Sequence, residues 1–119
     1  MENTTEKIEN VVNLDYLTEL SKGNKSFVKE MITLFLSENP EEIKALEAGI
    51  ANGNHDQIKT MAHKLKSTIP FVGLDKIIGD KVSEIENLAA DKADINEIES
   101  RFALIKKACE KAYLELTPA

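Results

Sequence analysis

The chain has 119 residues and a mass of 13.2 kDa, a length that accommodates one domain with a single hydrophobic core. It carries 15 Lys and Arg residues against 21 Asp and Glu residues, which gives a formal net charge of −6. Broad binding to nucleic acid requires positive charge that neutralises phosphates. The composition therefore argues against a nucleic-acid-binding role.

The sequence also argues against a membrane segment, a disulfide and a zinc site. No apolar run approaches the roughly 18 residues that suggest a membrane span, and residues 1–12 lack the apolar centre of a signal peptide. Cys109 is the single cysteine and there are two histidines, too few for a disulfide or a Cys/His zinc site. We expect a cytoplasmic protein without a metal or cofactor of its own.

The first part of the chain is predicted to form two short helices. Residues 1–12 have few large apolar side chains, and we expect them to be flexible. The domain is expected to cover residues 13–119. Asn13 can cap a helix that ends near Ser21, and a second helix is predicted over residues 26–38.

Four longer helices are expected in the rest of the chain. The run Asn39-Pro40-Glu41-Glu42 has the cap, the proline and the acidic first turn of a helix start, so a third helix is predicted to begin there and to end at Asn52-Gly53. Asn54 then caps a fourth helix that runs to about Val72 and is broken by Gly73.

Two further helix starts follow. Asp75 is expected to cap a fifth helix that ends near Ala90, and Asp94 with Glu97 forms a capping box for the last helix. The apolar residues of that last helix alternate in steps of three and four: Ile95, Ile98, Phe102, Ile105, Cys109, Ala112 and Leu116. Short connections make neighbouring helices antiparallel. We therefore predict an all-α protein, an antiparallel four-helix bundle with short N-terminal helices packed as a lid.

One polar residue of the fourth helix stands out on a helical wheel. Ile58, Met61, Ala62, Leu65, Ile69 and Val72 form its apolar face. His63 lies about 140° away from Ile58, which places the imidazole on the solvent side. Lys59 precedes it by four residues, and Lys66 and Ser67 follow it by three and four, so all three flank the ring.

The simplest interpretation of this face is a solvated histidine among solvated lysines. A second interpretation is chemical, because an exposed neutral imidazole is a nucleophile that can accept a phosphoryl group. The flanking lysines would offset the new negative charge, and the small Ser67 would let a partner approach. The sequence places no catalytic base or metal beside His63, which favours a carrier whose partners supply the catalysis.

The run Ala-His-Lys-Leu-Lys-Ser-Thr at residues 62–68, with Gly73 ten residues after the histidine, resembles the histidine-containing phosphotransfer (HPt) family of two-component phosphorelays. The resemblance extends from Leu14 to about Leu116 and includes the upstream apolar pattern of residues 27–36. It implies that His63 is the phosphoacceptor and that Lys66 favours its phosphorylated form. It also implies that Ser67 keeps the surface open and that Gly73 allows close helix packing.

Other positions are expected to support the site or to contact a partner. Lys59 is a supporting cation, and Lys64, Pro70 and Phe71 are candidate docking residues. Pro70 departs from the family pattern. It removes the hydrogen bond that its N–H would give to the Lys66 carbonyl, so we expect a kink or a wide turn above His63. Phe71 is then either a docking contact or a packed side chain.

The resemblance implies a phosphorelay intermediate rather than an enzyme. A receiver domain or a hybrid sensor kinase would phosphorylate His63, and an aspartate of another response-regulator receiver domain would accept the group. Mg²⁺ is expected in the partner receiver domain, and a monomer is expected because one histidine suffices. Two alternatives stay open: a helical adaptor that binds receivers without transfer, and an enzyme that uses His63 as base or nucleophile. The latter would need a concave pocket and an orienting carboxylate.

Overall fold

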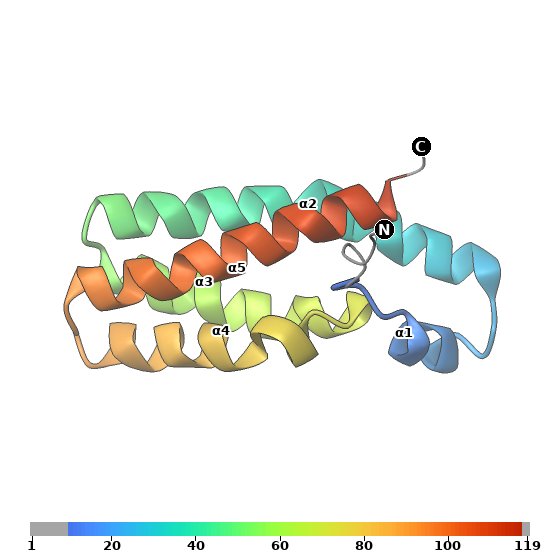
Figure 1. Cartoon of the computed structure of the whole chain (residues 1–119), viewed down its shortest axis with the longest axis horizontal. Coiled ribbons are helices and arrows are strands. Elements are labelled where there is room, and N and C mark those ends of the chain that lie inside the picture. Colours follow the sequence, from blue (N-terminus) through green and yellow to red (C-terminus); the bar gives the residue numbers. More distant parts are fainter. Residues whose placement is uncertain (1–9, 118–119) are drawn as a thin grey trace, which may run out of the picture.

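The computed structural model describes residues 10–117, and its elements are all helical over that range. Figure 1 shows their arrangement. In chain order they are α1 (Asp15–Leu20), α2 (Lys25–Ala51), α3 (His55–Thr68), the 3-10 helix η2 (Ile69–Val72), α4 (Asp75–Ala90) and α5 (Ile95–Leu116). Helices α2 to α5 form an antiparallel bundle in which α2 packs on α3, α3 on α4, α4 on α5, and α5 on α2. The predicted all-α bundle is confirmed.

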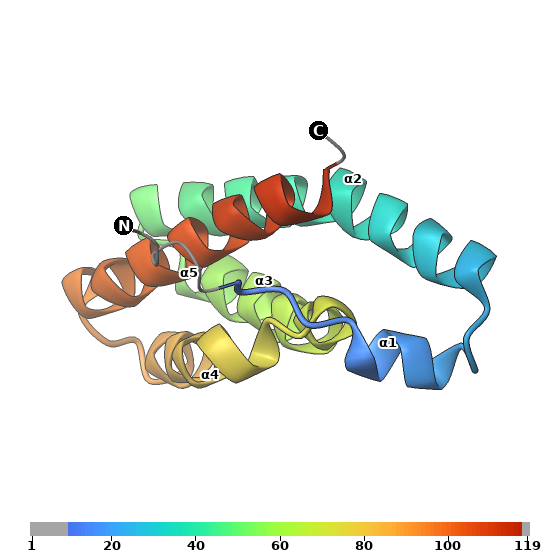
Figure 2. The ribbon, with the colours of Figure 1, turned by 45° about the vertical axis from the view of Figure 1, so that its right-hand side comes forward.

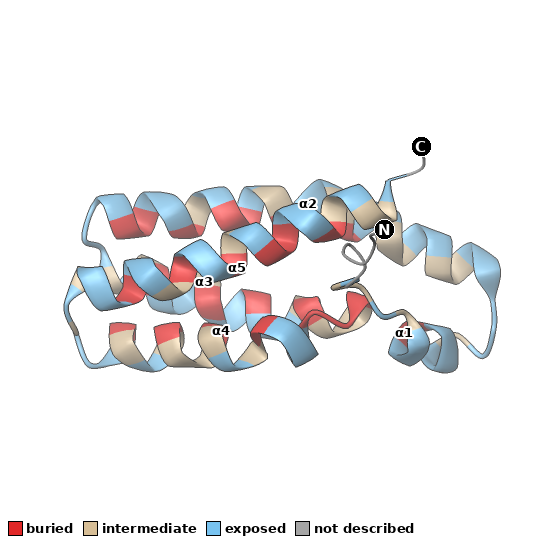
Figure 3. Ribbon diagram, viewed as in Figure 1, coloured by how far each residue is buried: buried red, intermediate tan, exposed pale blue. Residues whose placement is uncertain are grey.

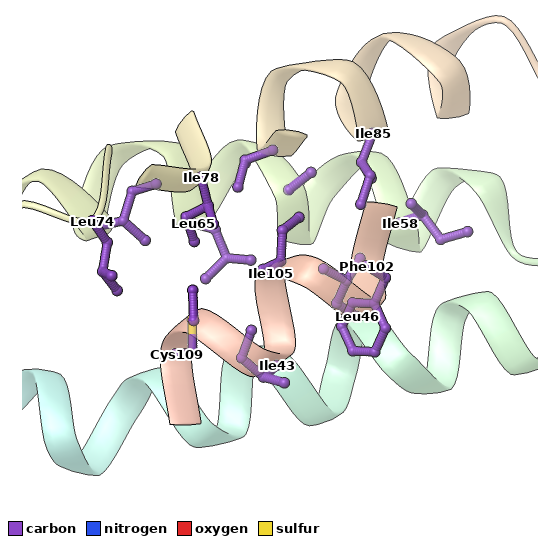
Figure 4. Close-up of a cluster of buried hydrophobic side chains, with 14 of the residues drawn as sticks. Ile43, Leu46, Ile58, Leu65, Leu74, Ile78, Ile85, Phe102, Ile105 and Cys109 are labelled. Atoms are coloured by element: carbon purple, nitrogen blue, oxygen red, sulfur yellow. The ribbon is translucent and has the colours of Figure 1, made fainter. Parts of the chain in front are cut away.

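The core fills the space between these four helices (Figures 3 and 4). The apolar residues of α5 that the three-and-four spacing singled out supply much of one wall, since Ile98, Ile105 and Cys109 are fully buried. Helix α3 contributes Ile58, Ala62 and Leu65. One side of α3 therefore packs in the core, and the opposite side of the helix faces solvent.

The expected helix break at Asn39-Pro40 is wrong. Helix α2 continues through both residues, and Pro40 lies in its interior. Asn39 is 1% exposed, and the hydroxyl of Tyr113 on α5 donates a hydrogen bond to its side-chain oxygen. The Phe35 ring also packs against Tyr113, with ring centroids 6.1 Å apart. These contacts hold the part of α2 just before the proline against α5, so local helix-start signals are overridden.

The lid is smaller than expected, because one of its two predicted helices is the first half of α2. Figure 2 shows this half extending past the end of α5, with α1 lying below it in this view. Helix α1 packs on η2 and α2. Of the segment expected to be flexible, residues 1–9 lie outside the described range. Val11 and Val12 do not fit that expectation, since their backbone N–H groups donate to the Glu115 carboxylate at 3.0 Å each.

The corner between α3 and α4 differs from the expected kink. Helix α3 ends at Thr68. The tighter 3-10 helix η2 follows directly and contains Pro70, so the chain neither kinks nor widens there. Gly73 then adopts a left-handed conformation with φ of 78°. Helix α4 begins at Asp75, but no side chain caps it, so the predicted Asp75 cap is wrong. The caps at Asn54 and Asp94 are confirmed, because their side chains accept from the N–H groups of Gln57 and Asn96. Glu97 is not the partner of the Asp94 side chain, since its N–H donates to the Asp94 backbone carbonyl.

Candidate functional site

The candidate site is the solvent face of α3, next to α4. His63 sits on this face with 73% of its side chain exposed, while its neighbours Ala62 and Leu65 are fully buried. The helical periodicity of α3 is the reason, because the apolar stripe that anchors the helix leaves His63 on the opposite side. The ring is therefore accessible to a large partner.

A carboxylate from α4 contacts this ring. The Nδ1 atom of His63 lies 2.9 Å from Oε2 of Glu86, and the Nζ atom of Lys66 lies 2.8 Å from Oε1 of the same carboxylate. Glu86 thus bridges the histidine and the lysine that follows it by one helical turn. Its side chain is only 16% exposed.

The charge state of Glu86 follows from these contacts. The hydrogen bond from Lys66 lowers the pKa of the Glu86 carboxyl below its usual 4.5, and the contact with His63 adds to this effect against the opposing influence of burial. The carboxylate is therefore ionised at neutral pH and can only accept hydrogen bonds. A neutral His63 ring consequently carries its proton on Nδ1, and the lone pair of Nε2 remains available for reaction.

Sequence reasoning missed Glu86, and the expectation that no candidate base lies beside His63 was wrong. A signal was nevertheless present in the chain. Two antiparallel helices that meet at a corner pair residues at similar distances from that corner. His63 lies 11 residues before Leu74 and Glu86 lies 12 residues after it, so the hairpin places them side by side.

The other lysines and Ser67 occupy the same exposed part of α3 but point to different neighbours. Lys64 lies toward α2, where its Nζ atom is 3.9 Å from Oε2 of Glu42. Ser67 is exposed, and its hydroxyl donates to the Lys64 carbonyl at 2.8 Å. Lys59 is exposed one turn before His63. The structure therefore brings Lys66 to the carboxylate beside His63 and directs Lys64 away from it.

Pro70 and Phe71 lie in η2, just after the C-terminal end of α3, next to the lid. The half-buried Phe71 ring packs against Tyr16 of α1 with centroids 6.2 Å apart. Pro70 lines a cleft of about 800 Å³ that it shares with Tyr16 and Gly73, and His63 does not line this cleft. Both residues stand about 13 Å from His63 along the helix axis, given the rise per residue of α and 3-10 helices.

Gly73 lies very close to the backbone of Asn13, in the segment before α1, and not to a neighbouring helix. A Cβ atom at this position would lie 2.5 Å from the Asn13 carbonyl oxygen, and the N–H of Asn13 donates to the Val72 carbonyl at 2.9 Å. The glycine therefore lets the segment before α1 cross the corner between η2 and α4. Its place in the fold is structural, and it lies apart from the imidazole.

Metal-ligating side chains do not gather at this site. Among residues 10–117, no group of three or more His, Cys, Asp or Glu side chains is placed to hold a metal ion. Within the same range, no helix is both long and apolar enough to cross a membrane.

The fold and the site define a helical-bundle protein that presents a histidine on its surface rather than in a pocket. A comparison with protein-family models matches the Hpt domain over residues 30–113, and the chain belongs to this family. Hpt domains act in histidine phosphotransfer within phosphorelays, as phosphocarriers whose partners include receiver domains. Comparisons with curated proteins and with solved structures found no match.

Proposed function

We propose that this protein is a phosphorelay intermediate that carries a phosphoryl group on Nε2 of His63. The group comes from an aspartyl phosphate of a receiver domain, or from a sensor kinase, and leaves to the aspartate of a second receiver domain. The observation that carries this proposal is the contact between Nδ1 of His63 and the Glu86 carboxylate, because it prepares the opposite ring nitrogen for attack.

The transfer step needs only the His63 ring, the partner's aspartyl phosphate and the Glu86 carboxylate. The Nε2 lone pair attacks phosphorus, an N–P bond forms, and the bond between phosphorus and the aspartyl oxygen breaks, which releases the partner's carboxylate. The ring keeps its Nδ1 proton and gains positive charge, which faces the Glu86 carboxylate at 2.9 Å. The reverse step regenerates the neutral ring. Mg²⁺ is expected to be bound by the receiver domain, not by this chain.

Lys66 is the cation proposed to steady the phosphoryl group. Its ammonium lies 2.8 Å from the same carboxylate and 47% of its side chain is exposed, so it can turn toward a new anion on the ring. Lys59 adds positive charge one turn earlier on the helix. We assign docking roles to Lys64, Pro70 and Phe71, and an unobstructed approach to Ser67.

An enzyme that uses His63 as a base is a weaker proposal. Glu86 does supply an orienting carboxylate, which that alternative requires. The ring, however, is 73% exposed, and an exposed ring offers little to hold or desolvate a small substrate. The same exposure suits contact with a protein partner whose own active site surrounds the phosphoryl group. A monomer in the cytoplasm is the state in which we expect this transfer.

The test measures phosphate uptake from a phosphorylated receiver domain by intact mass. The wild-type chain should gain about 80 Da, one phosphoryl group, in an acid-labile form, and His63→Gln should gain nothing. His55→Gln is the matched control, because it removes the other histidine, whose ring contacts the Ala93 carbonyl at the N-terminal end of α3. Binding without uptake across a panel of receivers would favour the adaptor alternative.

A further inference from the structure

A second surface, formed by α4 and α5, carries a lysine-lined apolar groove. The groove has a volume of about 300 Å³. Its apolar lining consists of Val11, Ile77, Ile78, Leu104 and Ala108. Ile77 and Leu104 are each 51% exposed, so two large aliphatic side chains from neighbouring helices stand open to solvent. Burial of such side chains against a partner would be favourable.

The charge of this groove is opposite to that of the chain. Each ionisable side chain that lines it is a lysine, namely Lys81, Lys107 and Lys111, although the net charge of the chain is −6. Lys81 lies 3.7 Å from Glu84, and both side chains are about 40% exposed, so this pair is weak and open to exchange. The nearby Glu115 carboxylate is occupied by the backbone of Val11 and Val12. Lys81 and Lys107 therefore favour an acidic occupant of the groove.

The groove lies on a different side of the bundle from the candidate phosphoacceptor. Ile77 and Glu86 are both on α4 and are nine residues apart, which corresponds to about half a turn around the helix axis. Glu86 faces α3 and His63, whereas Ile77 faces the α5 side. A molecule in the groove would leave the imidazole accessible.

We propose that this groove binds an amphipathic helix of a partner protein, with apolar side chains on one stripe and acidic residues flanking it. The shallow valley between two antiparallel helices is the surface on which a third helix packs. The apolar stripe would contact Ile77 and Leu104, and the acidic flanks would meet Lys81 and Lys107. This site goes beyond the phosphocarrier function and would tether the carrier while it exchanges phosphoryl groups.

The test is a fluorescence titration of the full chain with an 18-residue synthetic helix that has leucines at i, i+3, i+4 and i+7 and glutamates beside them. Leu104→Ser should weaken binding about tenfold, as expected for loss of a central contact. Leu114→Ser is the control and should change binding less than about twofold. Leu114 is on the same helix, is 80% exposed and does not line the groove.

Charge reversal gives an independent variant. Lys107→Glu should weaken binding of the glutamate peptide and strengthen binding of the same peptide with lysines in place of glutamates. Binding of the glutamate peptide should also weaken when salt rises from low to about 0.5 M, because the lysines are screened. His63→Gln should leave peptide binding unchanged, which separates this proposal from the proposed function.

Three results would overturn the proposal. The first is equal affinity of wild type, Leu104→Ser and Lys107→Glu for the glutamate peptide. The second is self-association of the chain that Leu104→Ser abolishes while the peptide does not bind, which would make a second copy the occupant. The third is binding to anionic phospholipid vesicles without binding to the peptide, which would make the surface a membrane contact.

Discussion

Replacing Glu86 by glutamine removes one negative charge beside His63 and keeps the shape of the side chain. A hydrogen bond to an ionised group contributes about 1.5–3 kcal/mol, and the lower part of this range applies because the His63 ring is 73% exposed to competing water. Each 1.4 kcal/mol corresponds to a factor of about ten in rate. We therefore expect Glu86→Gln to slow phosphoryl uptake about tenfold.

A second readout distinguishes this role from simple damage to the fold. Without the carboxylate, Lys66 loses the partner at 2.8 Å and can serve the phosphoryl group alone. The phosphorylated form of Glu86→Gln should therefore persist longer than that of the wild type once the donor is removed. Slower uptake combined with slower loss is not expected from partial unfolding.

The assay is a time course of intact mass after mixing with a phosphorylated receiver domain. Glu84→Gln is the matched control, because Glu84 is on the same helix and its carboxylate pairs with Arg101 at 2.8 Å, away from the imidazole. It should take up phosphate at the wild-type rate. Equal rates for the wild type and both variants, or an equal slowing in both variants, would contradict this role of Glu86.

The same variant tests the charge state of Glu86 through stability. The pKa of this carboxyl is lowered by Lys66 and His63, so the ion pair stabilises the fold above the unfolded-state value of about 4.5. This contribution is lost as pH falls through the lower folded-state pKa. Urea unfolding should therefore show wild type more stable than Glu86→Gln at pH 7, with the gap closing below about pH 4.

Three further substitutions test buried contacts elsewhere in the bundle. Burial raises the pKa of the Glu42 carboxyl in the folded state. The folded state therefore loses stability as pH rises above the pKa that this carboxyl has in the unfolded chain. Glu42→Gln should raise the melting temperature at pH 7 but not at pH 4. Tyr113→Phe should lower the free energy of unfolding by about 1–2 kcal/mol, measured in urea, because it removes the hydroxyl that donates to buried Asn39. Gly73→Ala should cost at least about 2 kcal/mol in the same assay, since a left-handed residue is strained and its Cβ would collide with Asn13; an unchanged midpoint would contradict the close approach.

Local signals predicted the parts of this fold that depend on neighbours in sequence. The apolar spacing of α5 and the caps at Asn54 and Asp94 gave helices where the structure has them. The exposure of His63 also followed from periodicity, because a helix with one apolar stripe presents the opposite side to solvent. These features need no knowledge of what lies across the bundle.

The features that sequence reasoning missed depend on contacts between distant segments. A strong helix-start pattern at Asn39 and Pro40 is overridden because Tyr113, more than 70 residues away, binds the asparagine and packs on the same helix. Glu86 was missed for a related reason. On α4 it is one charged residue among several. Its contact with His63 becomes evident only when α3 and α4 are paired across the corner at Gly73.

The double contact of Glu86 suggests why a carrier would place an acid beside its phosphoacceptor. On the proposed mechanism, the carboxylate orients the imidazole and balances the positive ring during transfer, which favours uptake. It also repels the phosphoryl group and competes with it for Lys66, whose ammonium is 2.8 Å away. A phosphorylated state stabilised by every nearby cation would hold its phosphoryl group too firmly. On this mechanism Glu86 withholds part of the charge of Lys66, and the N–P bond would stay reactive enough for the group to move on to the next receiver domain.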